Sequence, residues 1–197
     1  LSEYVGKILD DDVEQANNIS LDLKDYPLFI SRNLSQTKKW LKMVSRGSER
    51  YGLVASSNAI RLKPYGLHMN SKLDPASWFL GDKDDVRSSF YLEDAASEFD
   101  IQGLELDWIG ICWDANLRRN NSDWEFHKFT GTKWQNIFKS ENQSYLINSY
   151  RVLMTRARQG MVIFVPEGDK RDHTRKPEFY DPIYDYLLSC GFKELHH

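Results

Sequence analysis

A helical pattern that leads directly into an apolar strand most limits how this chain can fold. Residues 144–158 have the pattern of a long helix, which ends in polar and cationic residues that include Arg156 and Arg158. Gly160 is predicted to form a tight turn, and residues 161–165 are an uninterrupted apolar run. A strand that is apolar on both faces is typical of the middle of a parallel sheet covered by helices.

The same alternation recurs along the rest of the chain. Strand patterns occur at residues 27–30, 51–57 and 106–113, and another is predicted within residues 89–99. Helical patterns separate them, at residues 2–9, 34–46, 58–62, 74–80 and 180–189. We therefore predict an α/β fold with a central, mostly parallel sheet flanked by helices. The polar and aromatic segment 116–140 is predicted to be an insertion or a hairpin.

The length of 197 residues suits one domain, which we place at residues 1–195. The chain starts at Leu1, which suggests a fragment of a larger protein, and His196 and His197 are interpreted as a possible tag remnant. Apolar residues make up 41% of the chain, but no apolar run approaches the roughly 20 residues that span a bilayer, so we expect no membrane contact.

Charge and cysteine content limit the function classes further. The net charge of −3 disfavours strong autonomous binding to nucleic acid. Cys112 and Cys190 have no CxxC partner, so we expect two buried reduced thiols and a cytoplasmic location. Asp107 and Asp114 lack a third ligand at a suitable spacing, so no metal site is predicted.

Three polar segments accompany the predicted strands. Ser56 and Ser57 follow one strand, residues 102–105 adjoin another, and Arg156 and Arg158 come just before the last. Ligands of open parallel sheets bind at the carboxyl ends of the strands, so we expect these segments at that edge. An arginine that a helix delivers to a sheet edge can stabilise the charge that develops when a nucleoside triphosphate is cleaved, an effect of roughly 10³–10⁵ in rate.

Two of these segments resemble helicase motifs. The string ASEFDIQGLELD at residues 96–107 resembles motif V of superfamily 1 helicases, and YRVLMTRAR at residues 150–158 resembles motif VI. The chain as a whole is similar to the C-terminal part of an uncharacterised bacterial superfamily 1 helicase-like ATPase family, a domain of unknown function. The helicase-like half of Schlafen proteins carries related motifs. The resemblance covers most of residues 1–190 and implies a RecA-like fold of the P-loop NTPase type.

The resemblance also implies roles for single residues. Arg156 matches the motif VI arginine that reaches the γ-phosphate on a partner domain, and Arg158 is expected beside the same nucleotide. Glu105 matches the motif V acid that approaches the ribose. Gln102 and Gly103 match the turn that couples the nucleotide state to the nucleic-acid channel.

The carboxyl end of the strand at residues 51–57 is expected to face the nucleic acid. Ser56, Ser57 and Arg61 lie where family members place residues of the DNA- or RNA-binding cleft. The chain lacks the GxxxxGK[ST] loop that cradles phosphates. ATP with Mg²⁺ would therefore bind to an N-terminal RecA-like domain of the full-length protein, and this chain alone is predicted to be inactive.

Alternatives stay open on the sequence alone. The fold could be a degenerate RecA-like domain that serves as a nucleic-acid-binding or protein-docking module without catalysis. Arg156 and Arg158 could simply complement the dipole at the end of a helix. Trp124 and Trp134, which lie among cations, could either stack on bases or hold local structure together.

Overall fold

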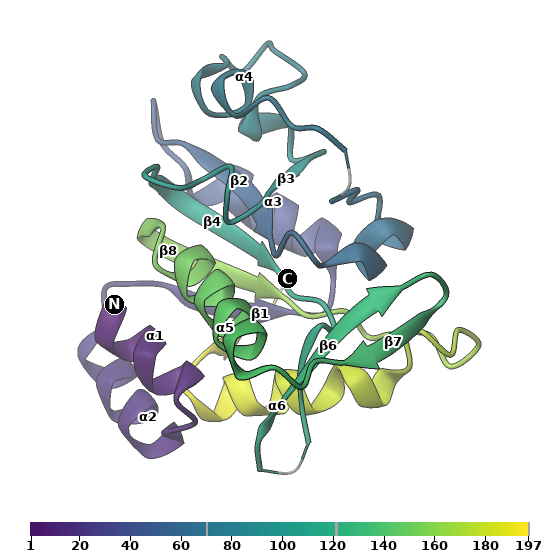
Figure 1. Ribbon diagram of the computed structural model, residues 1–197. Helices are drawn as coiled ribbons and strands as arrows, with labels where there is room; N and C mark the ends of the chain where they lie inside the picture. The colour runs from purple at the N-terminus through teal and green to yellow at the C-terminus, as the bar shows by residue number, and fades with distance from the viewer. Residues whose placement is uncertain (70, 121, 197) are drawn as a thin grey trace.

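The chain folds around a six-stranded parallel β-sheet in the computed structural model (Figure 1). Residues 1–69, 71–120 and 122–196 are described, so the interpretation of His197 as a tag remnant lies outside the described residues. All neighbouring strands of this sheet pair in parallel. Their spatial order is β3 (Ala95–Ala96), β2 (Tyr51–Ala55), β4 (Leu106–Cys112), β8 (Ala157–Phe164), β1 (Leu28–Ser31) and β9 (Lys193–Glu194). The predicted α/β fold class is confirmed, and the architecture is consistent with a RecA-like domain.

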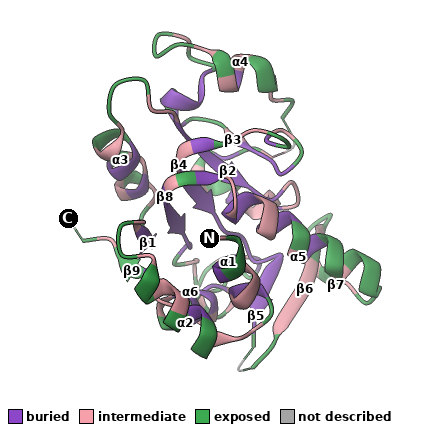
Figure 2. Cartoon of the chain, turned by 90° about the vertical axis from the view of Figure 1, so that its left-hand side faces the viewer, coloured by how far each residue is buried: buried purple, intermediate pink, exposed green. Residues whose placement is uncertain are grey.

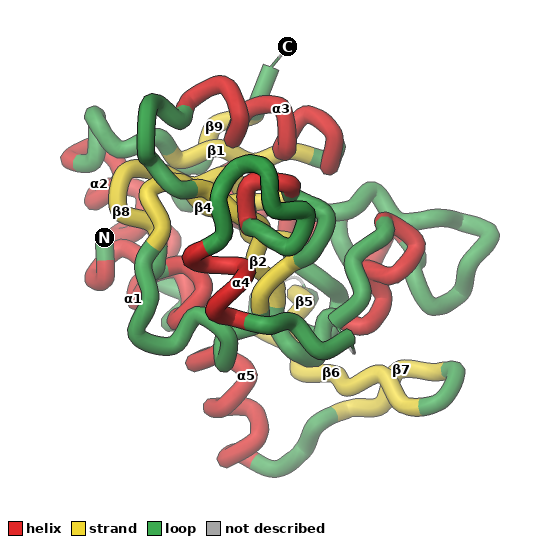
Figure 3. Tube along the Cα trace, turned by 90° about the horizontal axis from the view of Figure 1, so that it is seen from above, coloured by secondary structure: helices red, strands yellow, loops and turns green. Residues whose placement is uncertain are grey.

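Helices cover both faces of the sheet. One face packs against α1 (Ser2–Leu9), α2 (Val13–Asp22), α5 (Ser140–Met154) and α6 (Asp181–Ser189). The other face packs against α3 (Leu34–Val44) and the 3₁₀ turns η1 (Ile60–Tyr65) and η2 (Ser89–Tyr91). Figure 3 shows α3 and α5 on opposite sides of the sheet. The short helix α4 (Pro75–Leu80) lies beyond β2, and a further 3₁₀ turn, η3 (Pro177–Phe179), leads into α6.

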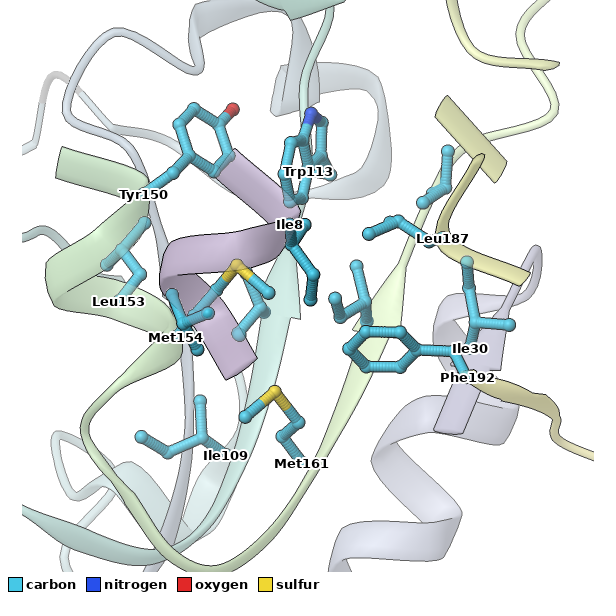
Figure 4. Close-up of a cluster of buried hydrophobic side chains, with 14 of the residues drawn as sticks. Ile8, Ile30, Ile109, Trp113, Tyr150, Leu153, Met154, Met161, Leu187 and Phe192 are labelled. Carbon is cyan, nitrogen blue, oxygen red and sulfur yellow. The ribbon is translucent and has the colours of Figure 1, made fainter. Parts of the chain in front are cut away.

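Alternate residues of each central strand enter two separate apolar cores. In β4, Ile109 and Ile111 face the core beneath α5, whereas Cys112 belongs to the core beneath α3. In β8, Met161 faces the core beneath α5 and Val162 faces the core beneath α3. Figure 4 shows side chains from α1, α5, α6 and the sheet meeting in the larger core, and Figure 2 shows the buried central strands. Burial on both faces explains why these strands are continuously apolar in the sequence.

The region 116–140 contains the predicted hairpin. Its strands β5 (Leu117–Arg119), β6 (Trp124–Thr130) and β7 (Lys133–Asn136) form a separate antiparallel sheet. Trp124 stacks on Trp113 of the main core, with ring centroids 5.8 Å apart. The indole of Trp134 donates to the Thr174 carbonyl at 2.8 Å. Both tryptophans therefore hold local structure together, as the second of the two alternatives proposed.

Buried arginines fasten this small sheet to the rest of the domain. The guanidinium of Arg118 lies 3.8 Å from the centroid of the Phe179 ring, and that of Arg119 lies 3.7 Å from the centroid of Tyr186. Arg119 also pairs with Asp11 at 2.7 Å. Desolvation by burial lowers the pKa of Arg118 to about 10. These cations work as structural ties, so they are not available as a binding surface.

The helix before the last central strand differs from its prediction. α5 spans Ser140–Met154 rather than residues 144–158, and Arg156 is already outside it. Gly160 lies inside β8, not in a turn. A β-carbon at Gly160 would come within 2.7 Å of the Trp108 ring, so glycine is needed here for close packing of the indole.

No helix in the described ranges is long and apolar enough to cross a membrane. Cys112 and Cys190 are free and buried, and burial raises the pKa of each thiol, to about 12 and about 11 respectively.

Gly52 in β2 allows a test of how α4 packs against the sheet. A β-carbon there would lie 2.7 Å from Cζ2 of the buried Trp78 ring of α4. We expect Gly52→Ala to lower the free energy of unfolding by about 1–3 kcal/mol, measured by urea denaturation. Trp78→Phe removes the clashing ring atoms, so the same alanine should cost less in that background. An equal cost in both backgrounds would contradict the packing explanation.

Candidate functional site

The two helicase-like segments meet at the amino edge of the sheet. Leu106 begins β4 and Ala157 begins β8, and the two residues are partners in register. The Leu106 amide donates to the Arg156 carbonyl at 3.0 Å. The carboxylate of Glu105, which precedes Leu106, lies 3.9 Å from Nε of Arg158, which follows Ala157. The pairing of two strands therefore places Glu105, Arg156 and Arg158 side by side.

This position corrects one prediction. Residues 102–105, Arg156 and Arg158 were expected at the carboxyl ends of the strands, together with Ser56 and Ser57. Residues 102–105 and Arg156 precede their strands in the chain, and Arg158 is the second residue of β8, so in a parallel sheet they all lie at the amino edge. The two serines follow β2 and lie at the opposite edge. The predicted site residues therefore form two groups, separated by the length of the central strands.

Arg156 differs from most arginines of the domain in having no partner. Its guanidinium makes no hydrogen bond or ion pair with any residue that the structure describes, and its Nε atom is buried. By contrast, Arg151 pairs with Asp10 at 3.5 Å, which is an acid at the end of α1. Arg158 pairs weakly with Glu105 and is largely exposed. An unpaired buried donor is costly unless a ligand or water satisfies it.

Arg156 lines an open hollow of about 200 Å³ between α5 and the segment 97–102. The α5 side of this hollow is formed by Tyr145, Asn148, Ser149 and Val152, and the other side by Glu98, Phe99 and Gln102. Gln102 and Arg156 therefore share one cavity, and Glu105 follows Gln102 by three residues without lining it. Gly103 adopts φ +78°, a left-handed conformation that favours glycine and turns the chain into β4.

Ser57, at the carboxyl edge, is hydrogen-bonded to the segment 97–102. Its amide and its hydroxyl both donate to the Glu98 carboxylate, each at 2.7 Å. Glu98 is itself buried and follows the edge strand β3. The segment 97–105 thus begins at the carboxyl edge, where it binds Ser57, and ends at the amino edge beside Arg156.

Ser56 occupies a buried polar network. It is fully buried, and its hydroxyl accepts a hydrogen bond from the Asn116 amide at 3.1 Å. The Tyr150 hydroxyl in turn donates to the side-chain oxygen of Asn116 at 2.6 Å. The expectation that Ser56 faces a nucleic acid is therefore corrected, because its side chain holds the end of β2 against α5.

Arg61 is engaged within the domain. Its Nε donates to the Thr174 hydroxyl at 2.9 Å, and its guanidinium pairs with Asp172 at 3.1 Å. The ring of Phe129 packs against the same guanidinium, with 5.2 Å between guanidinium carbon and centroid. Arg175 also donates to Asp172, at 2.9 Å, within the loop 169–175, and its guanidinium carbon lies 5.7 Å from the centroid of the Tyr65 ring.

Asp114 is a fully buried carboxyl at the end of β4. It accepts hydrogen bonds from the amides of Arg61 and Ala115 and from the Tyr180 hydroxyl. Burial nevertheless raises the pKa of this carboxyl above its usual range. No group of three metal-binding side chains occurs among the residues that the structure describes, so we assign Asp114 a structural role.

Motif matching did not single out the residues that complete the hollow. Glu98 and Phe99 stand inside the motif V-like string, but only their positions after β3 show what they contact. Tyr145, Asn148 and Val152 repeat at intervals of three and four along α5, which places them on one helix face. That spacing was the only signal in the sequence for this wall of the hollow.

Asp172 gives the domain a pH-dependent contribution to stability. Its carboxylate accepts hydrogen bonds from the Thr174 hydroxyl at 2.6 Å and from Arg175 and Arg61, and these hold its pKa well below the usual range. The stabilisation is fully present above about pH 4 and is lost as the pH falls through the folded-state pKa.

We expect Asp172→Asn to lower the free energy of unfolding by about 1–2 kcal/mol at pH 7. The difference from the unmodified chain should shrink as the pH is lowered below about 4, because the unfolded chain then takes up the proton before the folded one, and it should vanish below the folded-state pKa, where both proteins carry a neutral group there. Urea denaturation across this range measures the effect. The control is Asp185→Asn on the exposed side of α6, for which we expect a change within about 0.5 kcal/mol. A constant difference at all pH values would contradict the assignment.

Comparison with known proteins gives one match. Residues 1–167 match the family model described as "Schlafen group 3, DNA/RNA helicase domain". Searches of curated proteins and of solved structures returned no match. The matched range includes both helicase-like segments and the whole of α5 and β8.

Proposed function

The chain belongs to the Schlafen group 3 DNA/RNA helicase domain family, and from this premise we propose that it works as the second RecA-like domain of a superfamily 1 helicase-like NTPase. In this proposal ATP with Mg²⁺ binds to an N-terminal RecA-like domain of the same protein, and the present domain closes on it. The observation that carries the proposal is the unpartnered guanidinium of Arg156 at an open hollow.

Arg156 is the proposed arginine finger. No carboxylate of the described chain neutralises it, so its charge is available to an anionic ligand. Its Nε is already desolvated, which strengthens the attraction to phosphate oxygens because the local dielectric constant is low. The planar guanidinium can donate two parallel hydrogen bonds to a phosphoryl group. These properties suit stabilisation of the charge that develops during phosphoryl transfer.

Glu105, Arg158 and the turn at Gln102 would hold the remainder of the nucleotide. Glu105 and Arg158 are both solvent-exposed at the amino edge, and their contact of 3.9 Å is weak enough to be exchanged for a ligand. We propose that the Glu105 carboxylate accepts a hydrogen bond from the ribose. Gln102 lies in the hollow with Arg156 and would respond to whether a phosphate is bound there.

The segment 97–105 would couple the nucleotide to a DNA or RNA strand. One end is fixed to Ser57 at the carboxyl edge, and the other end adjoins Arg156 at the amino edge. A shift of Gln102 on hydrolysis would therefore pull on Glu98 and Ser57. We propose that Ser57 lies close to the nucleic acid, while Arg61 supports this edge through Asp172 and Thr174.

Arg156→Ala tests the finger in the protein in which this domain is joined to a phosphate-loop domain. Loss of transition-state stabilisation should lower ATP turnover by at least roughly 10²-fold. Arg156→Lys should recover only part of the rate, since lysine keeps the charge but lacks the planar fork. Phosphate release measures both. The matched control is Arg171→Ala, a highly exposed arginine in the 169–175 loop, which should keep normal turnover. Normal turnover by Arg156→Ala would overturn the finger assignment.

A second prediction concerns this chain by itself. We expect no measurable ATP turnover from it, because the groups that bind the β- and γ-phosphates would come from the other domain. The same phosphate-release assay checks this, with the joined protein as the positive control. Clear turnover by the chain alone would contradict the proposal that the other domain supplies the phosphate-binding groups. Binding of nucleic acid without turnover by the joined protein would favour the alternative, a non-catalytic RecA-like module.

A further inference from the structure

We infer that Tyr145 and Phe99 form a base-stacking site for single-stranded nucleic acid on the outer face of α5. This inference extends the proposed function, since it names the residues that would contact bases and the form of nucleic acid that they accept. It rests on three features of the domain: a pair of exposed aromatic rings, two adjoining hollows, and a set of unpartnered amide side chains.

The aromatic pair is unusually exposed for side chains of this size. Phe99 is 58% exposed and Tyr145 is 46% exposed, although large aromatic rings normally lose most of their surface on folding. Their ring centroids lie 6.2 Å apart at a tilt of 31°, so each ring keeps a face open. Two aromatic faces that are held in place but left in solvent form a platform on which an unpaired base can stack.

Tyr145 separates two hollows of similar size. The first, of about 200 Å³, is the hollow that contains Phe99 and ends at Arg156. The second, of about 210 Å³, lies between α5 and the β6–β7 hairpin, where Lys128 and His127 contribute to its wall. Each is smaller than the roughly 300–1,000 Å³ of a pocket for a whole small ligand, so each suits part of a chain, such as one base.

Four amide side chains line these hollows without a protein partner. Asn58 and Asn142 line the second hollow, and Gln102 and Asn148 line the first. None of the four side-chain amides makes a hydrogen bond to any residue that the structure describes. An amide offers a donor and an acceptor together, which is the pattern that reads the hydrogen-bonding edge of a base.

The charge of the site also favours a nucleic acid. Lys128 at one end and Arg156 at the other bring positive charge to the two hollows. The acid that lines the first hollow, Glu98, is buried and already accepts two hydrogen bonds from Ser57. Cations that flank exposed aromatic rings are typical of surfaces that bind single strands.

The same features disfavour a duplex. Bases in a double helix are stacked on one another and cannot place a face on Tyr145 or an edge against Asn142 and Asn148 without being unstacked. Val152 lines the same hollow as Arg156. Tyr145 and Val152 lie about two helical turns apart, or roughly 10 Å along α5. A base at Tyr145 therefore leaves room for a phosphate at Arg156, so the stacking site and the proposed nucleotide site can be occupied together.

Fluorescence anisotropy with labelled oligonucleotides tests the inference on this chain in the absence of ATP. The probes are oligothymidylate and oligouridylate of about 12 nucleotides, within the roughly 4–16 that one single-strand-binding domain covers, and a duplex of the same length. We expect binding to the single strands and much weaker binding to the duplex. Tyr145→Ala and Phe99→Ala should each weaken single-strand binding by about 5- to 100-fold, which corresponds to loss of one stacked base.

Two controls separate stacking from loss of fold. Tyr145→Phe keeps the ring and removes only the hydroxyl, so it should bind single strands normally. Tyr91→Ala removes an exposed tyrosine from η2, on the face of the sheet that α3 covers, and should also bind normally. Unchanged binding by both Tyr145→Ala and Phe99→Ala would overturn the inference, as would equal binding of duplex and single strands.

The outcome is separable from that of the proposed function. ATP turnover by the joined protein together with no oligonucleotide binding by this chain would refute the stacking site alone. Ring-dependent oligonucleotide binding by this chain, together with a joined protein whose turnover ignores Arg156→Ala, would refute the arginine finger alone.

Discussion

The pairing of β4 with β8 decides how this domain is organised. Both strands are buried on two faces, so their register is set by the side chains that enter the two cores. The segments that precede the strands are carried along by this register. The hydrogen bond from Leu106 to the Arg156 carbonyl is its last step at the amino edge, and it brings the two helicase-like motifs together. A slip of β4 by one residue would turn Ile109 out of its core and would separate Glu105 from Arg158 as well.

A second group of contacts holds the carboxyl edge. There Ser56, Asn116 and Tyr150 form a buried hydrogen-bonded chain that joins β2, the start of the small sheet and α5. The Glu98–Ser57 contacts add the segment 97–105 to this edge. Ile101 is buried in the core beneath α5, so the segment is also held in its middle. The two edges of the sheet are therefore connected by a short, well-anchored piece of chain. Such a connection can carry a change at one edge to the other, provided that it has two stable positions.

Polar side chains of the domain divide into those that hold it together and those that are left free. Arg61, Arg118 and Arg119 are engaged by carboxylates, carbonyls or aromatic rings, although one guanidinium nitrogen of Arg118 and one of Arg119 are buried without a hydrogen bond. The guanidinium of Arg156 and the side-chain amides of Asn142 and Asn148 on α5 have no such partner among the described residues. The distinction matters for function, because a group that already has its partners within the fold gains little from a ligand. A buried unpaired donor such as Nε of Arg156 gains a hydrogen bond that the fold does not provide, and an exposed amide exchanges a bond with water for one with the ligand. The free groups gather around one helix face, and both functional proposals are built there.

The sequence by itself determined the fold class and the motifs. The strands predicted at residues 106–113 and 161–165 were recognisable because burial on both faces requires a largely apolar run, whereas the polar first half of β8 was taken for the end of a helix and a turn. The motif strings pointed to Arg156 and Glu105 because their order along the chain is a local property. Only the tertiary structure decided which polar groups have hydrogen-bond or ion-pair partners within the fold and which do not. Ser56 and Arg61 looked like surface residues, yet their partners Asn116 and Asp172 lie far along the chain. Likewise the exposed faces of Phe99 and Tyr145 follow from how a loop crosses a helix, and that crossing depends on long-range packing that no local pattern records.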